Sequence, residues 1–325
     1  MKAMPIIQIT NSYSEKVLEI VQTCTPDGFS VRTLKSNSEE GLISCISDAD
    51  YILASGRTKI SRAVLDNAPN LKMIQRTGVG LDSLDIDAIK EKGIPLYVNA
   101  GVNSQSVAEH TVLLMLACLR RLTALDRNSK EGIWKSKEQA IDTYELCGKT
   151  VGIIGLGSIG CKVAAMLKAF NVKTLYYSVD DVAQDVEKEL GAERVPLDML
   201  LRQSDIITLH CPLTDDTKCL INDITLSQMK DGVIIVNTGR GGLIDEDAMY
   251  SAIVSGKVRS AGLDVHAQEP FSSESRLIPL DRVIATPHVA GVTYDSFFNM
   301  MSQAMRNIAL FEKGELDAIK QYRLA

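Results

Sequence analysis

Three side chains in the second half of the chain could together carry out acid–base chemistry on a small anion. Arg240 lies in Asn-Thr-Gly-Arg-Gly-Gly, Glu269 precedes a proline, and His288 lies in Thr-Pro-His-Val-Ala-Gly. Each follows a segment that we predict to be a strand: Gly232–Asn237, Val258–Leu263 and Arg282–Ala285. Because the carboxyl ends of parallel strands meet at one edge of a sheet, we expect the three side chains to converge there.

These three groups suit the reduction of a 2-oxo acid. Arg240 can bind the carboxylate and the carbonyl oxygen that becomes an alkoxide. The imidazole of His288 can give that oxygen a proton near neutral pH, and Glu269 beside it would stabilise the charged imidazolium. Taken singly, Arg240 could equally be a turn residue and Glu269 a solvated loop carboxylate.

A second motif predicts a dinucleotide site. An apolar strand beginning near Val151 is followed by Gly-Leu-Gly-Ser-Ile-Gly over 155–160 and then by a helix. Gly155, Gly157 and Gly160 would allow a tight turn, close approach of a pyrophosphate, and close packing of helix on strand. Ser158 and Ile159 open the helix, whose N-terminal amides would face the phosphates.

The elements around these motifs predict two α/β domains, which also suits a length of 325 residues. We expect a Rossmann NAD-binding domain over 101–289, inserted into a smaller flavodoxin-like substrate domain built from 1–100 and 290–325. Both should be doubly wound parallel sheets, with the cleft where they meet. One long helix is predicted over Ser104–Asn128, followed by an arm or loop over Lys130–Gly148. The strands expected in the smaller domain are Ile6–Thr10, Phe29–Leu34, Tyr51–Ala54, Leu71–Gln75 and Leu96–Val98.

Another turn, Gly78-Val79-Gly80, follows the fourth of these strands, at the edge where open α/β sheets bind ligands. Arg76 beside it favours an anion site, because a guanidinium can grip a carboxylate or phosphate through paired donors. A flexible turn with no ligand is the alternative.

Composition excludes several other classes of function. A net charge of −6 without a Lys/Arg-rich run argues against nucleic acid and anionic membranes as partners. The seven cysteines occur singly, without metal-ligand spacing, so we expect no metal and reduced thiols in a cytoplasmic protein. The chain enters a predicted strand near its start, and we expect no targeting segment or membrane span.

The sequence resembles the D-isomer-specific 2-hydroxyacid dehydrogenase family, in its phosphoglycerate and glycerate dehydrogenase-like form. The matching motifs follow in family order: Gly-Val-Gly-Leu-Asp (78–82), Asn-Ser-Gln-Ser-Val-Ala-Glu-His (103–110), the glycine motif 155–160, Leu-His-Cys-Pro-Leu-Thr (209–214), 237–246, Gly-Leu-Asp-Val (262–265), Glu-Pro (269–270) and 286–291. The resemblance implies hydride transfer between NAD(H) and a small 2-oxo acid and its (R)-2-hydroxy acid. Phosphoglycerate, glycerate or hydroxypyruvate, and glyoxylate are the substrates it suggests.

The resemblance also implies roles for individual residues. Arg240 would bind substrate, Glu269 would orient, and His288 would be the acid or base. The backbone at Val79 and Gly80 would hold the substrate carboxylate, and Arg76 with Arg57 could serve a phosphate or second carboxylate. The cofactor would contact Asp264 through its nicotinamide amide and would also meet Cys211, Pro212 and Thr238. We expect a homodimer joined through the nucleotide domains, and we expect no extra regulatory domain after His288.

The choice of dinucleotide depends on residues 178–181. The family's acidic NAD-selecting residue would fall at Ser178, and Asp180 comes two residues later. If Asp180 reaches the ribose hydroxyls, NAD is preferred; if Ser178 occupies the site alone, NADP becomes possible. The sequence shows no Arg or Lys nearby to neutralise a 2′-phosphate, which favours NAD.

Two other functions stay open at this point. One is a dinucleotide-sensing, corepressor-like interaction protein that keeps the same three residues, and the other is a phosphite-type dehydrogenase on the same fold. The first would need a partner-binding segment, which the sequence does not show. The second would differ in the substrate pocket.

Overall fold

The computed structural model describes residues 4–55, 58–272 and 274–325. The chain forms two compact units, one of Met1–Asn103 with Tyr294–Ala325 and one of Ser104–Thr293. The smaller unit is therefore discontinuous in sequence, and each unit is described by itself.

The smaller unit is a five-stranded parallel sheet in the order β2-β1-β3-β4-β5, which is the flavodoxin-like order. Its three central strands are largely buried. Its elements are β1 (Ile6–Ile9), α1 (Glu15–Cys24), β2 (Ser30–Arg32), α2 (Glu39–Ile43), β3 (Tyr51–Ala54), α3 (Arg62–Asp66), β4 (Met73–Arg76), α4 (Ile86–Glu91), β5 (Leu96–Val98) and α13 (Tyr294–Glu312), with 3₁₀ turns at Leu316–Ala318 and Lys320–Tyr322.

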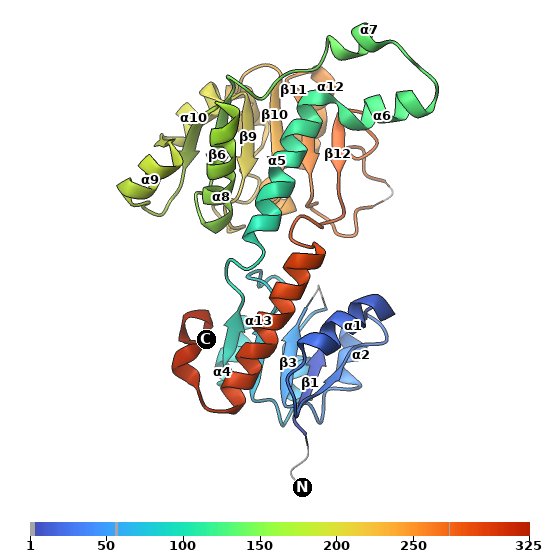
Figure 1. Cartoon of the computed structure of the whole chain (residues 1–325), viewed down its shortest axis with the longest axis vertical. Helices are drawn as coiled ribbons and strands as arrows, with labels where there is room; N and C mark the ends of the chain where they lie inside the picture. The colour runs from blue at the N-terminus through green and yellow to red at the C-terminus, as the bar shows by residue number, and fades with distance from the viewer. Residues whose placement is uncertain (1–3, 56–57, 273) are drawn as a thin grey trace. The chain divides into compact units, whose positions relative to one another are not determined.

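Helix α13 covers one face of this sheet, as Figure 1 shows in red beside the blue strands. Its buried residues Met301, Met305 and Ile308 share an apolar cluster with Ile9 and Tyr51 of the strands. The opposite face packs on α2, α3 and α4. The two layers of helices bury an apolar sheet on both sides, as a parallel sheet requires.

The larger unit holds a seven-stranded parallel sheet in the order β12-β11-β10-β9-β6-β7-β8, which is the Rossmann order with one added strand. Figure 1 shows α5 lying across this sheet. Its elements are α5 (Ser104–Arg120), α6 (Leu122–Lys130), α7 (Ser136–Ala140), β6 (Thr150–Ile154), α8 (Ser158–Leu167), β7 (Lys173–Tyr177), α9 (Gln184–Leu190), β8 (Ala192–Arg194), α10 (Leu197–Gln203), β9 (Ile206–Leu209), α11 (Asp223–Gln228), β10 (Val233–Asn237), α12 (Glu246–Ser255), β11 (Val258–Leu263) and β12 (Val283–Ala285), with 3₁₀ turns at Lys168–Phe170 and Gly241–Leu243. The predicted fold class, two parallel α/β sheets, is confirmed.

The prediction of one continuous helix over 104–128 was wrong. The chain breaks between α5 and α6 at Arg121, which has a left-handed φ of 49°. Arg121 Nη1 donates to Asp142 Oδ2 at 3.0 Å, so a contact with a later segment accompanies the break. Apolar periodicity cannot reveal such a break, because α5 and α6 both keep helical spacing.

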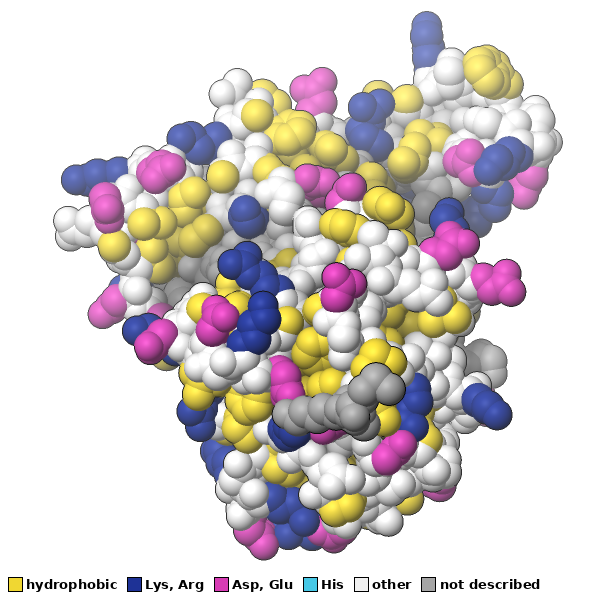
Figure 2. All heavy atoms as spheres, turned by 60° about the horizontal axis from the view of Figure 1, so that its bottom comes forward, with side chains coloured by type: hydrophobic (Ala, Val, Ile, Leu, Met, Phe, Trp, Pro, Cys, Tyr) yellow, Lys and Arg dark blue, Asp and Glu magenta, His cyan; other side chains and the backbone are white. Residues whose placement is uncertain are grey.

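The surface carries charges of both signs. Figure 2 shows acidic and basic side chains interspersed over the face in view. Among the helices that the structure describes, none is long and apolar enough to cross a membrane. Within residues 4–55, 58–272 and 274–325, no cluster of His, Cys, Asp and Glu could hold a metal ion.

Candidate active site

The glycine turn after β6 is closed on its protein side and open on the other. Gly155 has φ +97°, and a Cβ there would lie 2.6 Å from the backbone N of Cys211. A Cβ at Gly160 would overlap the carbonyl of Gly155. At Gly157, which caps the N-terminus of α8, a Cβ would meet no atom within 4 Å. Open space next to the first amides of a ten-residue helix fits the pyrophosphate of a dinucleotide.

The loop after β9 forms the wall against which Gly155 packs. Its residue Cys211 is partly buried, and burial raises the pKa of its thiol. The ring of the neighbouring His210 is shielded from water, and this burial lowers its pKa to about 3, so the imidazole is neutral. Its Nε2 lies 2.9 Å from Thr208 Oγ1. The start of the loop, at His210 and Cys211, therefore carries no charge.

The end of β7 corrects one step in the prediction of the cofactor. Ser178 follows β7 directly, and Asp180 and Asp181 beyond it are exposed. A basic residue does lie nearby: Arg194, at the end of β8, donates to Ser178 O at 3.1 Å and to Asp181 Oδ1 at 2.6 Å. It is sixteen residues beyond Ser178, and only the pairing of β7 with β8 brings it close.

Arg240 lies in a tightly fixed turn after β10. Asn237 Nδ2 donates to Arg240 O at 2.9 Å, and Gly239 N donates to Asn237 Oδ1 at 3.0 Å. Arg240 Nη1 donates to Gly239 O at 2.8 Å. Thr238 in the same turn is buried, with its hydroxyl 2.9 Å from that of Thr111 on α5. The side chain of Asn237 thus sets the backbone that presents Arg240.

Glu269 and His288 form a hydrogen-bonded pair. His288 Nδ1 lies 2.9 Å from Glu269 Oε2, and the other carboxylate oxygen accepts from His266 N at 2.9 Å. The His288 side chain is 37% exposed and that of Glu269 is 16% exposed. A carboxylate accepts only, so Nδ1 is the donor to Glu269, and Nε2 is the ring atom that can exchange a proton with a ligand.

The backbone at His288 is strained and is held by Asp264. His288 has φ 56°, a left-handed conformation that is uncommon outside glycine. Its N–H donates to Asp264 O at 2.8 Å, and the amides of Val289 and Ala290 donate to the carboxylate of Asp264 at 2.9 and 2.8 Å. Asp264 therefore grips the chain at and just after the strained residue.

Two residues without a predicted role complete this network. The hydroxyl of Thr286 donates to Asp264 Oδ1 at 2.5 Å, and His110 Nε2 lies 3.1 Å from that hydroxyl. The Asp264 side chain is only 1% exposed. Its carboxylate serves the loop that carries His288, so the predicted contact with a nicotinamide amide stays a prediction. In the sequence, only the place of Thr286 in the motif 286–291 indicated that it lies near the site.

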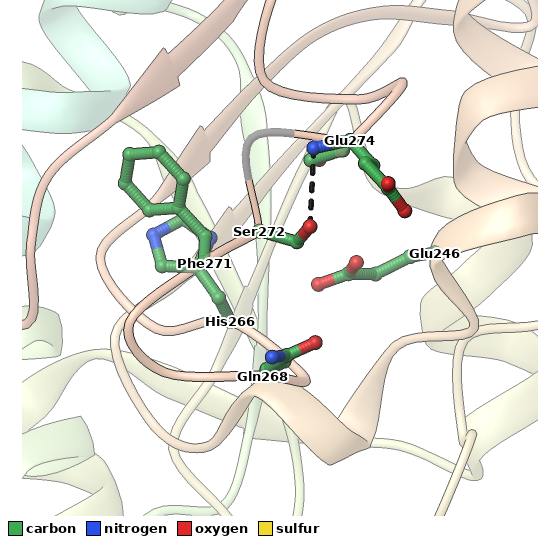
Figure 3. Close-up of a pocket in the computed structure, with 7 residues that line it drawn as sticks. Glu246, His266, Gln268, Phe271, Ser272 and Glu274 are labelled. Carbon is green, nitrogen blue, oxygen red and sulfur yellow. Dashed lines mark hydrogen bonds between the residues drawn. The ribbon is translucent and has the colours of Figure 1, made fainter.

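His266, for which the sequence suggested no role, lies beside Glu269. Besides its amide contact to Glu269, its Nε2 lies 3.1 Å from Thr286 O, and its ring packs edge-on against Phe271. Figure 3 shows it at a pocket of about 240 Å³ into which Glu246 and Glu274 also point. Two carboxylates disfavour an anionic 2-oxo acid in this pocket. His266 therefore holds the loop that carries Glu269, through its contacts with Glu269 and Thr286.

The remaining predicted residues belong to the smaller unit. Arg76 Nε donates to Gly80 O at 2.9 Å and Nη1 to Ala54 O at 3.4 Å. The guanidinium thus fixes the glycine turn, on which Val79 is 55% exposed. Arg57 lies outside the described residues.

The fold and the glycine turn define a dinucleotide-binding α/β protein with a His–Glu pair at the edge of its sheet. Residues 112–290 match the family model described as D-isomer specific 2-hydroxyacid dehydrogenase, NAD binding domain. The chain is 44% identical over 260 residues to a hydroxypyruvate reductase from Thermotoga maritima, covering 79% of this chain and 83% of that protein. It is 34% identical to a glyoxylate reductase from Pyrococcus furiosus, covering 96% and 94%.

The chain is also similar to a longer protein and to a solved structure. It is 38% identical to a D-3-phosphoglycerate dehydrogenase from Archaeoglobus fulgidus over 95% of this chain, but covers only 57% of that protein. The crystal structure of D-lactate dehydrogenase from Aquifex aeolicus, complexed with NAD and lactic acid, superposes with a TM-score of 0.87 at 30% identity, covering 98% of each chain.

The chain belongs to the D-isomer specific 2-hydroxyacid dehydrogenase family. It is an NAD-dependent oxidoreductase that interconverts 2-hydroxy and 2-oxo acids. The resemblance predicted from the motifs is confirmed.

Proposed function

We propose that the chain reduces a small, unphosphorylated 2-oxo acid, such as hydroxypyruvate or glyoxylate, to its (R)-2-hydroxy acid. We further propose that Arg240, Glu269 and His288 carry out this reaction. The observation that carries the proposal is the His288–Glu269 pair at 2.9 Å, held on a strained, anchored loop in the unit that contains the glycine turn.

Each of the three residues has a distinct part. NADH, when bound, supplies the hydride. Arg240 binds the substrate carboxylate and stabilises negative charge that develops on the carbonyl oxygen. His288 gives that oxygen a proton from Nε2, while Glu269 holds Nδ1 and stabilises the imidazolium that must be present before transfer. Oxidation of the hydroxy acid uses the same groups with His288 as base.

The substrate class is proposed from the glycine turn of the smaller unit. The backbone of the turn at Val79 and Gly80 would bind the carboxylate. Arg76 is the residue predicted to bind a substrate phosphate, but two of its guanidinium N–H groups donate to the carbonyls of Gly80 and Ala54. A guanidinium that fixes its own turn is a poor clamp for a phosphate, which favours the smaller acids over phosphohydroxypyruvate. The names of the two reductase relatives point the same way.

We also propose a homodimer formed through the larger unit. Support comes from apolar side chains exposed along α5 to the segment after α7: Leu113 (52%), Leu122 (52%), Trp134 (83%) and Ile141 (84%). Exposed apolar groups of this size commonly mark protein interfaces. A monomer mass in light scattering would contradict it. Location in the cytoplasm stays a prediction.

The decisive experiment compares wild type with His288→Gln. NADH oxidation is followed with glyoxylate, hydroxypyruvate, pyruvate and phosphohydroxypyruvate, and NADH binding is measured separately by fluorescence. We expect turnover to fall by about 10²–10⁴-fold in the variant with unchanged NADH binding. Wild-type turnover in His288→Gln would refute the role of the histidine. A higher kcat/KM for phosphohydroxypyruvate than for hydroxypyruvate would refute the substrate class.

A further inference from the structure

The pairing of two strands brings a guanidinium to the end of β7. Tyr177 O, at the last residue of β7, accepts from Gly155 N at 2.8 Å, so Ser178 comes directly beside the glycine turn. In the next strand, β8, Arg194 stands opposite Tyr176 in parallel register. Its Nη2 donates to Ser178 O at 3.1 Å. The edge strand of the sheet therefore places a fixed positive charge at Ser178.

This is the position at which Rossmann proteins distinguish NAD from NADP. A carboxylate there binds the ribose 2′-hydroxyl, whereas an Arg accommodates a 2′-phosphate. Ser178 presents a hydroxyl, which can donate to a phosphate or pair with a ribose hydroxyl. The end of β7 thus lacks the acidic side chain that would repel a phosphate, and it has a guanidinium that would attract one.

The guanidinium of Arg194 already forms an ion pair with the carboxylate of Asp181. Its Nη1 donates to Asp181 Oδ1 at 2.6 Å, where the side chain of Asp181 is 93% exposed and that of Arg194 is 41% exposed. Asp180 is exposed beside it, and Glu187 accepts from the hydroxyl of Tyr176. An ion pair this open to water is weak. A 2′-phosphate carries more charge than Asp181 and can accept two guanidinium hydrogen bonds, so it can replace that carboxylate.

We propose that Arg194 recognises the 2′-phosphate of NADP(H), and that Asp181 competes with this phosphate for the guanidinium. The inference rests on the dinucleotide site at the glycine turn. The chain then uses NADPH as well as NADH, and the ratio between them is set by the Asp181–Arg194 ion pair. A carboxylate at the end of β7 is not the determinant.

The test needs no turnover. Calorimetry on the protein without cofactor measures binding of 5′-AMP and of adenosine 2′,5′-bisphosphate, two ligands that differ only in the 2′-phosphate. The variants are Arg194→Gln, Asp181→Asn and the double substitution. Arg202→Gln is the matched control, because it removes an arginine from another exposed ion pair of the same unit, with Asp198 at 3.6 Å.

We expect Arg194→Gln to weaken binding of the bisphosphate by about tenfold and to leave 5′-AMP unchanged. Asp181→Asn should strengthen bisphosphate binding, and this gain should vanish in the double variant. Arg202→Gln should change neither ligand. The ratio of kcat/KM for NADPH to that for NADH should fall in Arg194→Gln and rise in Asp181→Asn.

Three results would overturn the assignment. Unchanged bisphosphate binding in Arg194→Gln would show that the guanidinium does not meet the phosphate. Equal weakening of both ligands would show that Arg194 only supports the loop at Ser178. Failure of the wild type to bind 5′-AMP would remove the nucleotide site itself, and with it the function proposed above.

Discussion

Gly241 offers a sharp test of how the active-site loops are fixed. It follows Arg240 and packs against the backbone just before Glu269. A Cβ at Gly241 would overlap the carbonyl of His266 and lie 2.5 Å from Ala267 N. Since ordinary Cβ contacts begin near 3.4 Å and the nearest atom, His266 C, would lie at 2.0 Å, one of the two backbones must move by about 1.4 Å. Gly241 is not among the glycines with positive φ, so the effect is steric.

This displacement has two measurable consequences. We expect Gly241→Ala to lower the free energy of unfolding by about 1–3 kcal/mol, as overpacking against backbone does. It should also lower kcat/KM by about 10²-fold, because the shift moves Arg240 relative to the Glu269–His288 pair by more than about 1 Å. Urea unfolding gives the first quantity and NADH oxidation the second.

The adjacent glycine is the matched control. A Cβ at Gly242 would meet Leu213 Cδ2 at 2.9 Å, and this is the end of a flexible side chain that is 39% exposed. Leu213 can rotate away, so Gly242→Ala should be close to wild type in both assays. Equal effects of the two substitutions, or wild-type kinetics in Gly241→Ala, would refute the argument that backbone contact with His266 positions the site.

Two further substitutions test buried polar groups near the site. In Asp264→Asn, the side-chain NH₂ faces the backbone amide of Val289 or of Ala290, so one buried donor is left unpaired. We expect the free energy of unfolding in urea to fall by about 1–3 kcal/mol. An unchanged unfolding midpoint would contradict the anchoring role of Asp264. His210 is neutral in the fold because burial lowers its pKa from 6.5 to about 3, so the unfolded chain takes up the proton first as the pH falls. Stability should therefore decline below pH 6.5, with about 2 kcal/mol lost at pH 5 through this residue. Urea unfolding at pH 7 and at pH 5 measures this loss of stability, and the loss should be about 2 kcal/mol smaller in His210→Asn than in the wild type. If wild type and variant lose the same stability between the two pH values, His210 is not the source of the loss.

The sequence predicted the sheets better than it predicted the contacts between distant loops. The run Tyr51–Ala54 is apolar throughout and Val258–Leu263 is mostly apolar, and both strands have these bounds in the structure. Short or partly polar elements were missed, among them β8, α10 and α11. They are too short for an apolar period to show, with three residues in β8, seven in α10 and six in α11.

In the candidate site, too, some contacts were predicted from the sequence and others were not. The pairing of His288 with Glu269 was expected from motifs at one sheet edge, and the structure has them hydrogen-bonded. The contact of Arg194 with Ser178 and the support of Glu269 by His266 were not expected. Both depend on register or on loop packing, and the side-chain types gave no signal of either.

The discontinuous smaller unit has a consequence for the order in which the chain folds during synthesis. Residues 104–293 are contiguous, so the larger unit has all of its strands before α13 is made. The first five strands, by contrast, have one apolar face that α1 covers only in part until Met301, Met305 and Ile308 arrive. The part of the chain that is synthesised first is thus the last to complete its core, and its exposed sheet face must stay free of aggregation while 190 intervening residues are added.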